Sequence, residues 1–421
     1  MKTQNSFKLS GADAFLLALE SHEDHFSFHD QFCHYILDIE GEISKQSLSD
    51  AFEKQGIENM NSLEIKGRHN FTVPFWRMME EKIPVKIEEI SALTASDFEE
   101  TYTILNESVK NHDNISIQYN YHRDTDTTTL IFRWNHLLLD AFGAYTILNY
   151  AGGNMERENI KFYPDSIPVF FNLFGFYKII RFISNSSHPP IYFPAVKKHP
   201  SDQPYLRLLS FDVDESKSIK QHAADMKSGI FLSNYLLACV SKTVHEMTSD
   251  GSSDFWVPIP INSRKKGIKG PLFTNPLSFY FFRIKRSLCM NITANVADLH
   301  LQMTSQLKKR QPFFYRKLTE FMRFLPLRIY YFFVVGWKRK NHASFMFTMA
   351  QTHDETFATF LNKKIKGALN IPPNTYPPGL TFAFMEFNKS LRVMILSRKN
   401  IFDELAMDQI HNILKQNLLN P

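Results

Sequence analysis

Hydrophobic and polar positions change their spacing within the stretch TTTLIFRWNHLLLDAFGAYTILN, residues 127–149. Its first part, residues 128–134, is a run of β-branched and aromatic residues that follows the polar segment HRDTDT, which predicts a strand entered from a turn. From Leu137 onward, apolar residues recur at steps of three and four, which predicts a helix. His136 and Asp140 therefore flank a junction between a strand and a helix.

The spacing HxxxD occurs three times in the chain, so the spacing alone carries little weight. The first copy, in FCHYILDIEG, lies in an alternating stretch that predicts a half-buried strand with no helix after it. The second copy lies in the charged turn HRDTD. Only the third copy, His136 and Asp140, has a strand before it, a helix after it and a Gly-Ala pair at 143 and 144. We therefore single out His136, which such a junction can present to a cleft, with a structural histidine as the alternative.

The same patterns predict an α/β unit before and around this motif. The expected elements are a short helix over 8–20, a strand over 32–39, an amphipathic helix over 43–55, extended segments over 71–90, a helix over 96–110 and a hairpin of residues 115–123 with the strand that leads into His136.

A second α/β unit is predicted after residue 204. Its expected elements are an alternating strand from Tyr205, two helical patterns separated near Gly229, the strands FWVPIPIN and PLSFYFFRI, a helix over 293–311, closing strands and a final amphipathic helix. We expect three parts: an N-terminal lobe at 1–155, a linker or crossover at 156–204 and a C-terminal lobe at 205–421.

The decapeptide NHLLLDAFGA, residues 135–144, resembles the HHxxxDG motif of the superfamily of condensation domains and CoA-dependent acyltransferases, often written HHxxxDGxGA. Asn135 replaces the first His, and Ala141 replaces the Gly, where a positive φ would strain an alanine. The resemblance implies two chloramphenicol-acetyltransferase-like lobes that form a V-shaped pseudo-dimer with a channel between them. Away from the decapeptide, the resemblance is a pattern of elements over nearly the full length.

The resemblance also implies roles for individual residues. In this superfamily the second His acts in catalysis and the Asp is structural, so His136 would be the general base and Asp140 a brace paired with an Arg. The segments VPIPINSR and TNPLSFYFF are similar to a region of wax-ester-synthase and condensation-type acyltransferases, in which an Arg-bearing strand end precedes an Asn that opens the next strand. Arg264 and Asn275 match those positions. Arg264 is the first candidate partner of Asp140 and Arg68 the second, with a solvated turn charge as the alternative reading of Arg264.

Acyl transfer from a thioester requires a group that accepts a proton from the attacking hydroxyl or amine, and histidine suits this at neutral pH. A GxSxG nucleophile elbow is absent from the sequence, which favours direct transfer over an acyl-enzyme. Asn275 or Ser278 could donate a hydrogen bond to the oxyanion, and Asn135 could orient the acceptor.

Composition narrows the classes of partner. The net charge of +5 is spread without a basic stripe, so nucleic acid is not an expected partner, whereas phosphates, CoA or an acidic membrane surface are. The three cysteines are too few and too far apart for a disulfide framework or a zinc site, and we expect no metal and no bound cofactor. The start of the chain has no secretory apolar region and no run of 18 apolar residues occurs, so we expect a cytoplasmic protein.

Two apolar stretches with basic residues leave membrane contact open. SIPVFFNLFGFYKIIRFIS, at 166–184, is either an interfacial amphipathic helix or a helix packed over the junction of the lobes. FMRFLPLRIYYFFVVGWKRK, at 321–340, is a second stretch of this kind. Together with 39 Phe residues, these stretches favour a lipid-like substrate and a peripheral membrane contact.

The sequence thus predicts a monomeric acyltransferase of lipid metabolism that moves a fatty or other apolar acyl group from CoA or a carrier-protein thioester to an alcohol or amine. Two alternatives stay open at this point. One is a condensation enzyme of peptide-synthetase type, and the other is a non-catalytic carrier-binding or membrane-binding member of the same fold.

Overall fold

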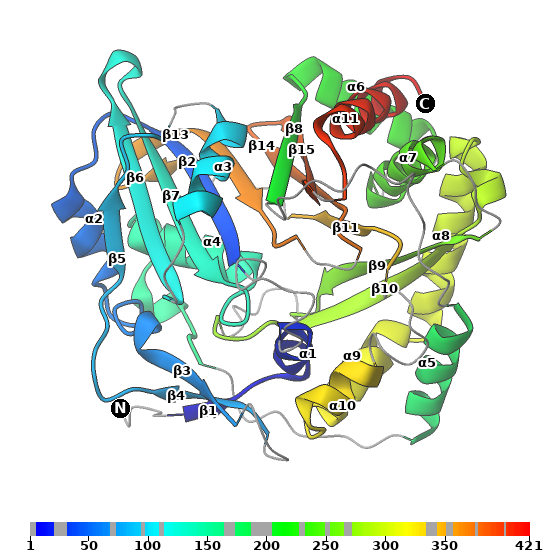
Figure 1. Cartoon of the computed structure of the whole chain (residues 1–421), viewed down its shortest axis with the longest axis horizontal. Helices are drawn as coiled ribbons and strands as arrows, with labels where there is room; N and C mark the ends of the chain where they lie inside the picture. The colour runs from blue at the N-terminus through cyan, green and yellow to red at the C-terminus, as the bar shows by residue number, and fades with distance from the viewer. Residues whose placement is uncertain are drawn as a thin grey trace.

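Two buried strands form the centre of the first sheet. β2 (Phe32–Glu40) pairs antiparallel with β7 (Thr127–Asn135) along its whole length, and every residue of β7 is buried. β6 (Ile115–His122) pairs antiparallel with the other edge of β7, which confirms the predicted hairpin. The computed structural model in Figure 1 describes residues 6–20, 32–67, 73–93, 97–108, 113–163, 173–186, 204–226, 232–248, 253–264, 272–333, 343–350, 357–374, 378–399 and 401–421.

Strands from both halves of the chain complete this sheet, whose order is β12-β13-β2-β7-β6-β5. β5 (Lys86–Glu89) pairs parallel with β6, while β13 (Lys363–Ile371) follows the short β12 (Thr359–Phe360) and pairs antiparallel with β2. The sequence pattern predicted no strand at 359–371 and left these residues in the C-terminal lobe. The first sheet therefore takes two strands from late in the chain, and the boundaries expected at 155 and 205 stay predictions.

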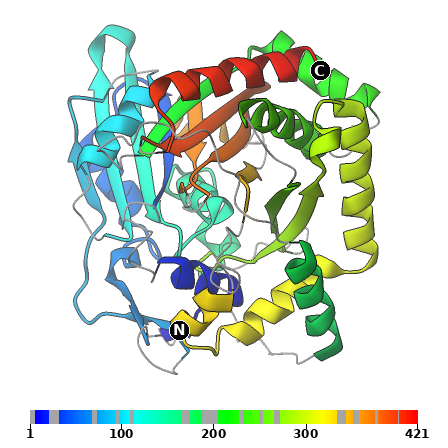
Figure 2. The ribbon, with the colours of Figure 1, turned by 45° about the vertical axis from the view of Figure 1, so that its right-hand side comes forward.

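The second large sheet belongs to the C-terminal half and has the order β11-β14-β15-β8. Its strands are β8 (Pro204–Ser210), β11 (Met346–Met349), β14 (Thr381–Phe387) and β15 (Ser390–Arg398). α6 (Val213–Asp225) contacts β15, and α11 (Glu404–Leu419) contacts β8 and α7 (Leu232–Met247), as Figure 2 shows for α11. Alternate side chains of these strands form a second core with α6, α7 and α11, whereas the side chains between them join the core around β2 and β7. The two cores confirm the predicted two-lobed α/β fold.

A pair of strands lies between the two cores. β9 (Phe255–Asn262) and β10 (Leu277–Ile284) are antiparallel, and their side chains alternate between the cores. Trp256 and Phe281 belong to the first core, whereas Val257 and Phe282 belong to the second. Because successive side chains of a strand point to opposite faces, this pair packs against both lobes. The end of β9 and the start of β10 thereby reach the motif loop of the first lobe.

The remaining elements are helices and a small sheet of order β1-β4-β3. α2 (Lys45–Phe52) buries Leu48, Ala51 and Phe52, as its spacing predicted. The others are β1 (Ser6–Lys8), α1 (Gly11–Glu20), β3 (Leu63–Lys66), β4 (Phe75–Met78), α3 (Phe98–Ser108), α4 (Ala141–Ala151), α5 (Leu173–Ser186), α8 (Ile292–Lys308), α9 (Gln311–Met322) and α10 (Leu327–Tyr331).

Candidate active site

The loop between β7 and α4 carries the motif, and Asn135 stabilises its turn with two hydrogen bonds. The Asn135 side-chain oxygen accepts a hydrogen bond from the Leu137 amide at 2.9 Å, and its carbonyl accepts one from the Leu138 amide at 3.0 Å. Leu137, Leu138 and Leu139 are fully buried. Asn135 therefore stabilises the turn with its own side chain, and the three leucines anchor the loop in the first core.

The ring of His136 is oriented by a carbonyl of the same loop. The Leu139 carbonyl oxygen accepts a hydrogen bond from Trp134 Nε1 at 3.1 Å and lies 3.1 Å from His136 Nδ1. Because a carbonyl oxygen can only accept, His136 Nδ1 carries the proton in this contact. In the neutral ring Nε2 then holds the lone pair, so His136 presents its basic nitrogen at Nε2. The His136 side chain is half-buried.

Asp140 is paired with Arg264, as the sequence predicted. Asp140 caps α4, where its Oδ1 accepts from the Gly143 amide at 2.8 Å. Arg264 Nη1 donates to Asp140 Oδ2, and Arg264 Nη2 donates to Oδ1 at 3.1 Å. The Arg264 side chain is only 6% exposed and that of Asp140 21%. This bidentate pair ties the end of β9 to the start of α4. Arg68, the second candidate partner, lies outside the described residues.

The replacement of Gly by Ala at position 141 fits the backbone. Ala141 is the first residue of α4 and does not have a positive φ. The closely packed glycine is Gly143, where a Cβ atom would lie 3.3 Å from the Leu272 carbonyl oxygen and 3.4 Å from Asp140 Oδ1. The absence of a side chain at 143 thus lets the first turn of α4 approach the segment before β10.

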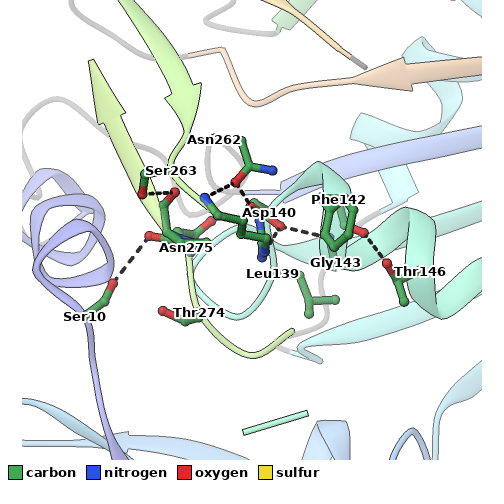
Figure 3. A network of polar contacts seen from close by, with 12 residues as sticks. Ser10, Leu139, Asp140, Phe142, Gly143, Thr146, Asn262, Ser263, Thr274 and Asn275 are labelled. Atoms are coloured by element: carbon green, nitrogen blue, oxygen red, sulfur yellow. Dashed lines mark hydrogen bonds and ion pairs between the residues drawn. The ribbon is translucent and has the colours of Figure 1, made fainter. Parts of the chain in front are cut away.

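Asn275 fastens the motif loop from the other side. Its Nδ2 donates to the His136 carbonyl at 2.9 Å and to Asp13 Oδ1 at 2.8 Å. Figure 3 shows Asn275 between Ser10 and the loop that carries Asp140. Asn275 therefore links the motif loop to Asp13 of α1 through its two amide hydrogens. Ser278 donates its hydroxyl to the Pro312 carbonyl at 2.6 Å, which directs that group toward α9.

Asp13 is a buried member of this network that the sequence did not single out. Its carboxylate accepts from the Ser10 amide at 2.7 Å, from Thr274 Oγ1 at 3.2 Å and from the Asn275 amide at 2.8 Å, besides Asn275 Nδ2. The spacing Ser-x-x-Asp before an apolar run signals a helix start, and Ser10 and Asp13 do bond reciprocally there. The contact with Asn275, 262 residues later, leaves no local signal.

A second buried acid lies close by, where α9 meets the start of α1. Burial raises the pKa of Glu320, and the Gly11 amide and Arg323 oppose that rise. A Cβ atom on Gly11 would meet the Glu320 amide nitrogen at 2.3 Å, so the two helices are in close contact there. This contact fixes the position of α1 and hence of Asp13.

Neither the cysteines nor the potential metal ligands form a further reactive centre in the described part of the chain. Cys33, Cys239 and Cys289 are free and buried, as predicted. Burial raises the pKa of Cys239 to about 12 and that of Cys289 to about 11, which keeps both as thiols at neutral pH. Among the described residues, no group of His, Cys, Asp and Glu side chains could hold a metal ion.

Comparisons with known proteins give matches at the level of structure. No protein-family model and no curated protein sequence matches the chain. The trichothecene 15-O-acetyltransferase of Fusarium sporotrichioides matches with a TM-score of 0.72 at 12% identity, over 98% of this chain and 95% of that one.

Condensation domains match over similar lengths. The condensation domain of a monacolin K polyketide synthase has a TM-score of 0.68 at 10% identity, over 99% of this chain and 98% of that one. The first condensation domain of the calcium-dependent antibiotic synthetase has a TM-score of 0.67 at 11% identity, over 100% and 98%. At these identities the likeness shows the fold, which is that of condensation domains and this acetyltransferase.

Proposed function

We propose that the protein is an acyltransferase that moves an acyl group, fatty or otherwise apolar, from a CoA or carrier-protein thioester to an alcohol or amine. The single observation that carries the proposal is the contact between His136 Nδ1 and the Leu139 carbonyl, which leaves Nε2 as a proton acceptor at the end of a buried strand. The shared fold and the motif at 135–144 support the same reading.

In the proposed reaction, His136 Nε2 takes the proton of the acceptor hydroxyl or amine while its oxygen or nitrogen attacks the thioester carbonyl. The tetrahedral intermediate collapses, the carbon–sulfur bond breaks, and the imidazolium returns the proton to the leaving thiolate. The products are an ester or amide and a free thiol, and His136 is neutral again. The acyl carrier enters as a co-substrate, without a resident cofactor.

The residues around His136 hold the motif loop in place. The pair of Asp140 and Arg264 ties the end of the loop to the end of β9, and Asn275 holds the His136 carbonyl. Since both amide hydrogens of Asn275 are engaged, we assign it to positioning of the loop. The side-chain nitrogen Nδ2 of Asn135 is the group that would orient an acceptor, because the side-chain oxygen accepts from the Leu137 amide.

The test is an assay of free thiol released from acyl-CoA donors of short to long chain, with alcohol and amine acceptors, and with product masses as the second readout. His136→Ala should lower thiol release by roughly a thousandfold, within the range that general acid–base catalysis contributes. Retention of full turnover by His136→Ala would contradict the mechanism. A circular-dichroism melt shows whether the variant is folded.

A condensation enzyme that takes both substrates from carrier proteins is the second candidate, because the two condensation domains reported above match nearly the whole chain. It predicts turnover with carrier-bound donors and none with acyl-CoA. The same assay with a phosphopantetheinylated carrier protein in place of CoA separates the two.

A further inference from the structure

The outer face of α5 is apolar although it is exposed. Leu173, Phe174, Tyr177 and Ile180 are between 51% and 68% exposed, and their spacing places them along one side of the helix. A helix on the surface of a globular protein normally shows polar residues on its outer face. These four side chains therefore mark a surface that contacts something other than water.

The inner face of α5 is packed, so this exposure does not come from a detached helix. Phe176 and Ile179 are buried with Leu318 of α9, and the ring of Phe176 lies 5.7 Å from that of Phe321. One turn later, the ring of Phe182 lies 6.1 Å from that of Trp256 in β9. The helix is thus fixed on α9 and β9.

Helix α9, which contacts α5, and helix α10 also expose apolar side chains. Figures 1 and 2 show α5, α9 and α10 together at the end of the molecule that lies away from α6 and α11. Their exposed apolar residues, together with those of the segment just after each helix, are Phe313, Phe324, Ile329, Phe332 and Phe333. We call these five side chains and the four of α5 the apolar helix surface.

The charged side chains that these helices expose are all positive. Lys178 lies over the ring of Phe174 at 4.1 Å and Lys317 over that of Phe313 at 5.8 Å, while Arg181 and Arg328 are exposed. Neither α5 nor α10 contains an acidic residue, and the acid of α9, Glu320, is buried. Apolar rings beside cationic side chains match the interfacial layer of a bilayer that carries anionic headgroups.

We propose that the apolar helix surface binds an anionic lipid bilayer peripherally, with its aromatic rings at the level of the headgroups and its lysines and arginines on the lipid phosphates. A second copy of the chain fits less well, because pairing the surface with itself brings cations against cations. None of the described helices is long and apolar enough to cross a membrane, so the contact lies in the plane of one interface. The inference is independent of acyl transfer.

The test is a flotation assay of the whole protein with vesicles of phosphatidylcholine alone and with added phosphatidylglycerol. The wild-type protein should bind the anionic vesicles at least about tenfold more tightly, since each basic residue near the surface contributes about 1 kcal/mol. The variant Leu173→Ser/Phe174→Ser/Tyr177→Ser should lose at least about tenfold in affinity for them. Lys178→Gln/Arg181→Gln should lose roughly thirtyfold on anionic vesicles and little on neutral ones.

The matched control is Leu405→Ser, because Leu405 is 68% exposed, as Phe174 is, and belongs to α11, which lies away from α5, α9 and α10 in Figure 1. It should bind vesicles as the wild type does. The proposal is overturned if the wild-type protein does not float, or if the α5 variant binds as well as the control while its melt shows a folded chain. A wild-type dimer in analytical ultracentrifugation that the α5 variant turns into a monomer would overturn it as well, because a second copy would then cover the surface.

Discussion

Two HxxxD pairs of identical spacing lie in different surroundings, one inside β2 and one at the end of β7. His34 and Asp38 are both 4% exposed, and Asp38 accepts a hydrogen bond from Thr129 at 2.7 Å. Burial, followed by the charge of Arg133, lowers the pKa of His34 to about 3. His136 is half-buried and its carboxylate partner in the motif, Asp140, binds Arg264.

The difference follows from the backbone that carries each pair. In a strand, residues four apart point to the same face, so His34 and Asp38 are both covered by what packs on that face of the sheet. At the strand-to-helix junction, the chain turns between the two residues, and the histidine and the aspartate meet different neighbours. The partial exposure of the imidazole therefore depends on the junction and not on the spacing.

The largest expected effect on stability concerns the ion pair between Asp140 of the second motif and Arg264. Arg264→Ala should lower the free energy of unfolding by about 3 kcal/mol, because it leaves Asp140 without the cation that faces it. Urea denaturation measures this value. The control is Arg283→Ala, which removes an exposed pair with Asp254 and should cost under about 1 kcal/mol. Equal losses in the two variants would show that the Arg264 pair has no special weight.

The next effect concerns pH and the first motif. The pKa of His34 is lower in the folded protein than the ordinary value near 6.5, so its contribution to stability is full above that pH and is lost as pH falls toward 3. Each pH unit in this window costs about 1.4 kcal/mol, hence roughly 2 kcal/mol between pH 6.5 and 5. His34→Gln removes this titration, so unfolding free energies of both proteins at pH 7 and pH 5 isolate it. The same pH dependence in both would contradict the assignment.

The smallest expected effect comes from the hydrogen bonds by which Asp13 holds Asn275 and, through it, the second motif. Asp13→Asn replaces an acceptor of four hydrogen bonds and should lower kcat about tenfold with little change in KM, because it loosens the loop without touching substrate. Steady-state kinetics of the acyl-transfer assay measure both constants. Asp50→Asn, on the outer side of α2, is the control and should leave kcat unchanged. A rise in KM alone would assign Asp13 to substrate binding.

The local parts of this fold follow from sequence spacing, and the long-range parts do not. The strand at β7, the turn before it and the helix after it are set by neighbours within a few residues, and so are the buried residues of α2. The strand β13 depends on pairing with β2, more than 300 residues away, and its own pattern did not reveal it. The hydrogen bonds from Asn275 to Asp13 and to the His136 carbonyl are equally non-local. Because the sequence does not reveal these contacts, we expected the Asn275 side chain to be available as a donor to the oxyanion. Arg264 could be identified because the two strand segments around it resemble a region of known acyltransferases.

The measurement that bears most directly on the role of the second motif is a side-by-side acyl-transfer assay of His136→Ala and His34→Gln under one set of conditions. We predict that His136→Ala loses roughly a thousandfold in thiol release, in line with the loss of a general base, whereas His34→Gln stays within about threefold of the wild type. Equal activity of the two variants, or a larger loss in His34→Gln with its fold intact, would contradict the account.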